Sequence, residues 1–279
     1  MRATTLSGRH GRSAAGTGFI HGPLVWALVT GCGGGLPLLH PAQAIDPGQV
    51  RAAAGFSANV ATGEFAEALR AATHPNATVA GEPDTAAAEG ALAEASLAPG
   101  IAPWAAARVG IWESAEGGLT YTGRAVRADI RRVFKLSRTW SLSVGAAGSA
   151  VLSGRQAGGT VAGVDLGALR GWGADTPLLV GYSSDGDLYM AWLGARGGWE
   201  HVEAGGMQGE PGMPAPPFSI SATRWWGGGL LGAAVGFRHI HVAMEIDASY
   251  ANVTGSLAGT HAQVAGLMLT PAGCVWWDF

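Results

Sequence analysis

Charged residues are scarce in this sequence. Only 13% of its 279 residues are Asp, Glu, Lys or Arg, and the formal net charge is -3 at pH 7. A basic surface for nucleic acid is therefore not indicated, and we expect no nucleic-acid partner. The hydrophobic content of 48% also excludes a disordered chain, because such chains bury too little apolar surface to fold.

Long hydrophobic runs are missing as well. A membrane-spanning helix needs roughly 20 consecutive apolar residues, and the best candidate after the N-terminal region, Trp225 to Phe237, is shorter and rich in glycine. The chain contains 46 glycines, and each costs about 1 kcal/mol relative to alanine inside a helix. The composition therefore favours short extended segments over helices.

Cysteine is also rare, because the chain has only Cys32 and Cys274. Cys32 lies in an N-terminal region that has the features of an export signal. Three arginines precede an apolar run that begins at Pro23, and residues 41–44 (Pro-Ala-Gln-Ala) form the small-x-small pattern that signal peptidase cuts. We therefore predict export and no intramolecular disulfide.

Two cleavage sites are compatible with this N-terminus. Residues 29–33 (Val-Thr-Gly-Cys-Gly) resemble the lipobox of bacterial lipoproteins, which would make residues 1–31 the signal and Cys32 an acylated first residue. The glycines around Cys32 favour this alternative. Val29 in place of the commoner Leu, and apolar residues as far as Leu39, favour a signal peptide of residues 1–44 instead. The sequence leaves both alternatives open.

Residues 45–100 are predicted as an extended and helical connector. Residues 45–60 form one extended segment, and the spacing of apolar residues predicts a short helix from Thr62 to Ala72. The Ala-rich, acidic stretch that follows, as far as Pro99, is interpreted as a solvated connector or a loose helix.

From Ile101 onwards the apolar residues recur at every second position, which is typical of β-strands. Between Ile240 and Tyr250 the even positions are apolar, whereas His239, His241, Glu245 and Asp247 share the opposite phase. Buried ionisable groups need water or partners. An apolar outside around a polar interior provides them, so we predict a transmembrane β-barrel for residues 101–279.

The segments suggest an all-β, up-and-down antiparallel barrel of eight strands, preceded by the signal peptide and the partly helical segment. The predicted strands are 103–112, 118–134, 139–152, 170–183, 187–201, 218–236, 239–253 and 264–279. Short and long links alternate between them, as in transmembrane barrels, except for the short link at residues 114–117. If residues 49–60 also form a membrane strand, another must be hidden before Pro99 and the barrel has ten.

Four residues oppose this interpretation. Pro177 and Pro271 fall within predicted strands, where proline cannot donate a ladder hydrogen bond. Arg124 and Arg132 fall on the apolar phase, which is tolerable only near a membrane interface, since arginine at the midplane costs ~2–4 kcal/mol.

The chain ends in Val-Trp-Trp-Asp-Phe, in which Val275, Trp277 and Phe279 share one face. This end resembles the C-terminal signal of bacterial outer-membrane barrel proteins, which finishes in Phe. The resemblance is to small outer-membrane barrels as a class. It implies insertion into the outer membrane of a Gram-negative bacterium, with outer-membrane lipid around the barrel and the barrel assembly machinery as a partner through the C-terminus.

The inward phase of the predicted strands carries charges of both signs, which we interpret as a polar network that fills the lumen. Its predicted members are Arg127, Asp129, Arg131, Asp175, Arg196, His239, His241, Glu245 and Asp247. An eight-stranded barrel is just wide enough for side chains to fill it, so we expect no porin activity.

No residue pattern points to catalysis, a metal or a cofactor. His239 and His241 have a ligand-like spacing, but no further convergent ligand can be placed. Residues 181–186 lack the Gly-x-Ser-x-Gly spacing of a serine nucleophile.

The first hypothesis is therefore a non-enzymatic outer-membrane barrel, with or without a lipid anchor, that serves envelope structure, adhesion or surface binding. A soluble periplasmic barrel lipoprotein that binds a ligand, with inward-facing apolar residues, is the alternative. An outer-membrane enzyme that modifies lipid is the third.

Overall fold

The computed structural model describes residues 35–72, 84–154, 160–161, 164–206 and 218–279. The arginines and Cys32 of the predicted export signal lie outside these residues. Within them, no helix is long and apolar enough to cross a membrane. Cys274 is buried as a free thiol.

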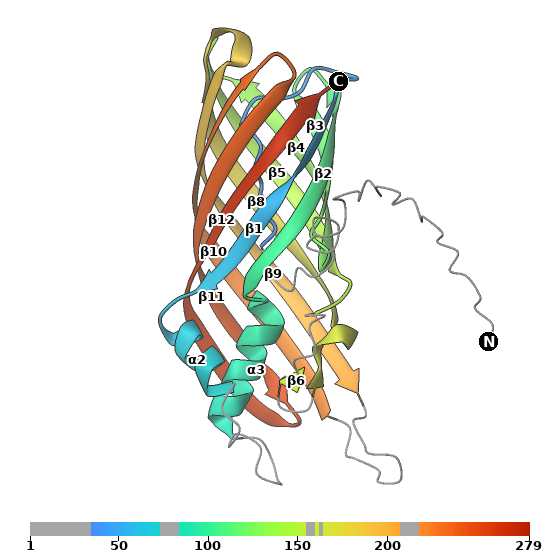
Figure 1. The fold of residues 1–279 in the computed structure, drawn as a ribbon, viewed down its shortest axis with the longest axis vertical. Helices are drawn as coiled ribbons and strands as arrows, with labels where there is room; N and C mark the ends of the chain where they lie inside the picture. Colours follow the sequence, from blue (N-terminus) through green and yellow to red (C-terminus); the bar gives the residue numbers. More distant parts are fainter. Residues whose placement is uncertain (1–34, 73–83, 155–159, 162–163, 207–217) are drawn as a thin grey trace, which may run out of the picture.

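The described chain forms a closed antiparallel barrel of ten strands (Figure 1). Neighbouring strands are consecutive along the chain, and β1 closes the barrel between β2 and β12. The strands are β1 (Val50–Ala61), β2 (Gly100–Trp112), β3 (Ala115–Tyr121), β4 (Ala125–Lys135), β5 (Trp140–Val151), β8 (Arg170–Ser183), β9 (Tyr189–Gly206), β10 (Phe218–Phe237), β11 (Ile240–Leu257) and β12 (Thr260–Asp278). The up-and-down barrel class was predicted, but the favoured count of eight strands was wrong.

The two additional strands have different origins. β1 comes from the segment predicted as part of the N-terminal connector, so the barrel begins at Val50 and not at residue 101. The other arises because the predicted strand 118–134 is two strands, β3 and β4, with a turn at residues 122–124 between them. Gly123 has a φ of 77°, which favours glycine. The tenth strand therefore does not lie before Pro99, where the alternative placed it.

The two ends of the barrel differ in their links. At one end, here called the turn end, the strands are joined by residues 113–114, 136–139, 184–188 and 238–239. The C-terminus lies at this end, at the top of Figure 1. At the opposite end, the helix end, the links 62–99, 152–169 and 207–217 are long, whereas 122–124 and 258–259 are tight. The short link at residues 113–114 is therefore no exception, because it belongs to the turn end.

Two helices close the helix end of the barrel, α2 (Glu64–Ala72) and α3 (Thr85–Leu97). The Asp84 side chain caps α3 by accepting a hydrogen bond from the Ala87 backbone N–H at 2.7 Å. Phe65 and Leu92 are fully buried among inward-facing residues of β9–β12, such as Val253. The described part of the Ala-rich stretch is therefore a packed helix, and neither the solvated connector nor the loose helix that we predicted, because its alanines allow close approach to α2 and the strands.

Smaller elements lie in the links. A two-stranded sheet pairs β6 (Thr160–Val161) with β7 (Val164–Asp165), and 3-10 helices follow at η2 (Leu166–Ala168) and η3 (Asp185–Asp187).

The outer surface of the barrel is apolar. Val242, Leu193 and Met244 are 52%, 57% and 71% exposed, whereas Arg127 and Glu116 are 1% and 0% exposed. Aromatic residues gather towards both ends of the strands. At the turn end they are Trp112, Phe134, Trp140, Tyr182, Tyr189, Phe237, Trp277 and Phe279, and towards the helix end they are Tyr121, Trp172, Trp225 and Tyr250. Trp172 and Trp225 each contact Trp199.

The prolines and arginines that opposed a barrel fit it by local adjustments. The β5–β8 pairing is interrupted beside Pro177, and the β1–β12 pairing is interrupted beside Pro271. Arg132 faces outward. It lies at the level of Trp112, because both residues pair with Ala115 on the strand between them. Arg124 lies in the turn before β4 and donates to the Ala95 carbonyl at 2.7 Å.

Candidate functional site in the barrel lumen

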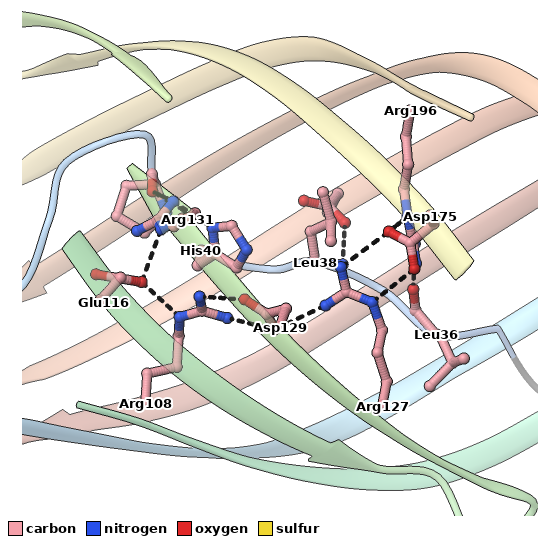
Figure 2. A network of polar contacts seen from close by, with 12 residues as sticks. Leu36, Leu38, His40, Arg108, Glu116, Arg127, Asp129, Arg131, Asp175 and Arg196 are labelled. Carbon is pink, nitrogen blue, oxygen red and sulfur yellow. Dashed lines mark hydrogen bonds and ion pairs between the residues drawn. The ribbon is translucent and has the colours of Figure 1, made fainter. Parts of the chain in front are cut away.

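Residues 35–46, here called the lumen segment, run through the inside of the barrel before β1 begins. Near the helix end, the Ser57 hydroxyl donates to the Gly35 carbonyl at 3.0 Å. Near the turn end, the Gly48 N–H donates to the Gly110 carbonyl at 2.9 Å, just after the segment leaves the lumen. Leu39, His40 and the residues around them are almost fully buried. The segment therefore crosses most of the barrel, with a left-handed backbone at Leu39 and a bend at residues 42–43 (Figure 2).

Glu245 on β11 binds the middle of the lumen segment. Its carboxylate accepts the backbone N–H groups of Leu38 at 2.9 Å and Leu39 at 3.1 Å. It also accepts the indole N–H of Trp192 at 2.8 Å. Three donors thus stabilise a carboxylate that is only 5% exposed.

Arg131 and Glu116 hold the part of the segment nearer the turn end. The Arg131 guanidinium donates to the carbonyls of Pro41 at 2.6 Å and Gln43 at 2.8 Å. It also donates to Nδ1 of the His40 ring at 2.6 Å. The Glu116 carboxylate accepts the Ile45 N–H at 3.0 Å.

An unbroken chain of ion pairs runs along the wall beside the segment (Figure 2). Arginines and carboxylates alternate in it. In order, it comprises Arg196, Asp175, Arg127, Asp129, Arg108, Glu116 and Arg131. Here we call it the lumen ion chain.

Every charged group in the lumen ion chain has at least one partner of opposite charge. Asp175 accepts paired hydrogen bonds from Arg127 at 2.8 and 2.9 Å and from Arg196 at 2.9 Å each. Such two-pronged contacts are the strong geometry for guanidinium and carboxylate. Arg108 likewise joins Asp129 at 2.6 Å to Glu116 at 2.5 Å. The chain has one more arginine than carboxylates, and Glu245 supplies a further negative charge in the lumen.

The chain also contacts the lumen segment directly. Arg196 donates to the Leu36 carbonyl at 2.5 Å while it holds Asp175. With Arg131 at the other end of the chain, both terminal arginines bind backbone carbonyls of the segment. The wall and the segment therefore form one connected polar structure.

Five of the nine residues predicted for the lumen network lie together in the lumen ion chain: Arg127, Asp129, Arg131, Asp175 and Arg196. Glu245 is also inside but binds the segment. His241 contacts the Asp187 carbonyl at 3.0 Å near the turn end. Asp247 lines a cavity beside α3.

His239 was wrongly assigned to the lumen. It is exposed in the link 238–239, because β11 begins only at Ile240 and strand alternation does not extend to the link. The prediction also missed Arg108 and Glu116. Arg108 lies on the inward phase of β2 with Trp104, so alternation could have found it. Glu116 was hidden because residues 114–117 were interpreted as a link.

Apolar side chains surround the segment where the ion chain does not. Leu38, Leu39 and Ala42 pack in a buried cluster with Trp192 and Trp276, which lie on β9 and β12. The other members are Trp104, Leu179, Met190, Leu230, Ala234, Ala243 and Cys274. The segment is therefore held by apolar packing on one side and by charged groups on the other.

A cavity of about 70 Å³ remains between the segment and α3. A water molecule needs roughly 10–15 Å³ of such volume, so several fit. Glu200 lies at its edge, 3.8 Å from Arg124 and 3.5 Å from Arg224. The other polar residues in its lining include Asn59, Ser96, Thr122, Ser149, Asp247 and Thr270.

The guanidinium and carboxylate groups of the ion chain are occupied by each other and by the segment. Within the part of the chain that the structure describes, no group of three or more His, Cys, Asp or Glu side chains is placed to hold a metal ion.

The sequence matches no known family of proteins and no curated protein. Comparison with solved structures finds outer-membrane proteins at low identity. Neisserial surface protein A is 11% identical, with a TM-score of 0.29, and the match covers 83% of this chain and 96% of that one. A major outer membrane protein from Thermus thermophilus is 12% identical, with a TM-score of 0.32 and coverage of 82% and 99%. Ail, the attachment invasion locus protein of Yersinia pestis, is 11% identical, with a TM-score of 0.24 and coverage of 84% and 99%.

Proposed function

We propose that this chain is a non-enzymatic outer-membrane barrel protein with a closed lumen, which acts in envelope structure, adhesion or surface binding through its helix end. The observation that carries the proposal is the direction of the side chains. The apolar residues of the strands face outward, and the charged residues face a filled interior. A barrel with this arrangement is stable in hydrocarbon.

The height of the apolar surface supports a membrane position. Tyr189 and Trp199 lie ten residues apart on β9, which is ~33 Å along a strand. With the usual strand tilt of ~40°, this corresponds to ~25 Å, about the height of an outer-membrane apolar band. Among the described residues, the outward strand positions between the two groups of aromatic residues carry no charge except Arg132, at the level of Trp112.

The soluble alternative requires the opposite arrangement. A ligand-binding barrel in water would place Leu193 and Val242 in its interior, yet they are 57% and 52% exposed. Burying such side chains in an apolar environment stabilises by about 1.5–3 kcal/mol each. Their exposure therefore favours a lipid environment around the barrel.

The filled lumen argues against transport through the barrel and favours a function at the surface of the cell. The lumen segment and the lumen ion chain occupy the interior, and α2 and α3 pack over the helix end. In outer-membrane barrels the short turns face the periplasm and the longer links face outside. We assign the helix end to the cell surface on this basis, and its links provide the surface for partners.

Two measurements test the proposal. Membranes washed with carbonate should retain the protein, and its migration on a denaturing gel should change on heating, as expected for a membrane barrel. Release of the protein into the soluble fraction would contradict the membrane assignment.

Epitope tags test the orientation. A tag inserted between Ala258 and Gly259 lies in the tight link of the helix end, and one between Arg238 and His239 lies in a matched tight link of the turn end. Antibody should bind the first tag on intact cells and the second only after permeabilisation. The reverse pattern would refute a surface role for the helix end.

A further inference from the structure

The lumen segment overlaps one of the two predicted signal cleavage sites. Cleavage after Ala44 would remove residues 35–44, which the structure places inside the barrel. Cleavage before Cys32 would leave them in the chain. The contacts of these residues therefore bear on how the protein is processed.

We propose that the lumen segment is retained in the mature protein as a permanent plug, and that processing occurs upstream of Gly35. This inference rests on the export and membrane insertion proposed above. Of the two predicted sites, it selects the one before Cys32.

The first argument is the position of Glu245. Its carboxylate is 5% exposed, and two of the three hydrogen bonds it accepts come from the backbone of the segment. Without the segment, the carboxylate would keep only the Trp192 indole as a protein donor, and water would have to enter the apolar cluster around Trp192 to solvate it. Leaving a buried charge without its partners is strongly unfavourable. The segment therefore supplies most of the donors of a carboxylate that lies against Trp192 in an apolar cluster.

The second argument is that both ends of the lumen ion chain point at the segment. Arg196 and Arg131 have donors left after pairing with carboxylates, and these donors bind carbonyls of residues 36, 41 and 43. A guanidinium has five N–H donors in a fixed plane. The segment therefore completes the hydrogen bonding of two buried arginines, which are 7% and 2% exposed.

The third argument is fit. Ala42 is fully buried, and a Cβ added to Gly181 on β8 would lie 2.7 Å from the Cβ of Ala42. Glycine at this position is what allows the segment to approach the wall. Likewise, a Cβ at Gly35 would lie 2.3 Å from the Thr270 side chain. Small residues in the segment and in the barrel wall thus allow the two to pack in close contact.

The sequence provides a direct test. No Lys or Arg lies between Arg12 and Arg51, so trypsin releases one peptide from the mature N-terminus to Arg51. Protein extracted from outer membranes should give a peptide that starts upstream of Gly35 and includes the whole segment. A peptide that starts at Ile45, or at any residue of 36–44, would overturn the proposal.

Two variants separate the cleavage sites. Ala44→Leu blocks signal peptidase at the small-x-small pattern, and we expect it to leave the N-terminus and the amount of membrane protein unchanged. Accumulation of uncut protein would contradict retention of the plug. Cys32→Ser should instead cause the uncut form to accumulate, whereas normal cutting after Ala44 in this variant would contradict the proposal.

Failure of the plug proposal and failure of the proposed function give different results. A carbonate-resistant, heat-modifiable barrel that begins at Ile45 would refute the plug and leave the membrane role intact. A protein that keeps the segment but is released into the soluble fraction would refute the membrane role.

Discussion

Replacing Arg127 with leucine removes the central arginine of the lumen ion chain. Its guanidinium is 1% exposed and joins Asp175, at 2.8 and 2.9 Å, to Asp129, at 2.8 Å. The leucine side chain fills part of the space but donates no hydrogen bond. The variant therefore leaves two buried carboxylates with fewer donors than before.

The magnitude follows from this geometry. Removing one partner of a buried ion pair typically costs about 3–5 kcal/mol in stability. Asp175 keeps Arg196 and Asp129 keeps Arg108 as partners, so we expect the lower end of that range, about 3 kcal/mol. Arg127→Lys preserves the charge but loses the planar fork, and its cost should be intermediate.

The assay is urea unfolding of the barrel in lipid vesicles, followed by tryptophan fluorescence. The matched control is Arg138→Leu, since Arg138 is 88% exposed and lies 3.5 Å from Asp185. An exposed pair contributes at most about 1 kcal/mol. The reasoning is refuted if both leucine variants shift the unfolding midpoint equally while the slope with urea stays the same.

Three further predictions concern the segment, the outer surface and assembly. Glu245→Gln removes a charged acceptor, and hydrogen bonds to such a group contribute about 1.5–3 kcal/mol. Hydrogen exchange of the segment's backbone amides, measured by mass spectrometry, should therefore accelerate at least about tenfold. Unchanged exchange rates would argue that the carboxylate does not hold the segment. Leu193 lies between the two groups of aromatic residues, so Leu193→Arg should destabilise the barrel in lipid by ~2–4 kcal/mol. Tyr189→Arg, near an interface, should destabilise it by only ~0–1 kcal/mol. Equal losses of stability would exclude a membrane around β9. Deletion of Phe279 should reduce the heat-modifiable barrel in outer membranes severalfold, and full recovery of folded protein would show that the C-terminal residue is not needed for assembly.

The barrel was predictable because its signal is local. Alternation along a strand reports which face each residue occupies, and this holds without knowledge of the neighbouring strand. Residues 240–250 show it clearly, since Val242 and Met244 are exposed and Glu245 and Asp247 are buried as the sequence pattern predicted. The all-β class and the inward phase of most charged residues follow from the same signal.

The strand count failed for a reason that is also local. The turn before Ala125 is only three residues long, and its Thr122 hydroxyl accepts the Ala125 N–H at 3.2 Å. Tyr121 and Val126 thus pair across the turn. The turn residues Thr122, Gly123 and Arg124 are too few to stand out as a link, so the sequence pattern predicts β3 and β4 as one strand.

The lumen segment could not be predicted by such rules. Its contacts join residues far apart in sequence, as when Leu38 binds Glu245 across 207 positions. Its apolar residues and its small-x-small pattern are also typical of a signal peptide. The same residues are therefore compatible with a cleaved signal and with a retained segment. Our proposal that the segment is retained rests instead on the buried donors and acceptors around residues 36–45.

The strand count and the lumen segment are two aspects of one packing problem. Eight strands enclose a space that side chains alone can fill, whereas ten strands enclose more. Many inward positions here carry small residues, among them Ala243 and Gly181. Side chains of this size leave space beside the large inward residues, and without the segment Arg131 and Arg196 would lose their carbonyl acceptors. The lumen segment supplies both volume and carbonyl groups. The prediction of a lumen filled by side chains therefore depended on eight strands, whereas in the ten-stranded barrel the threaded segment fills part of the lumen.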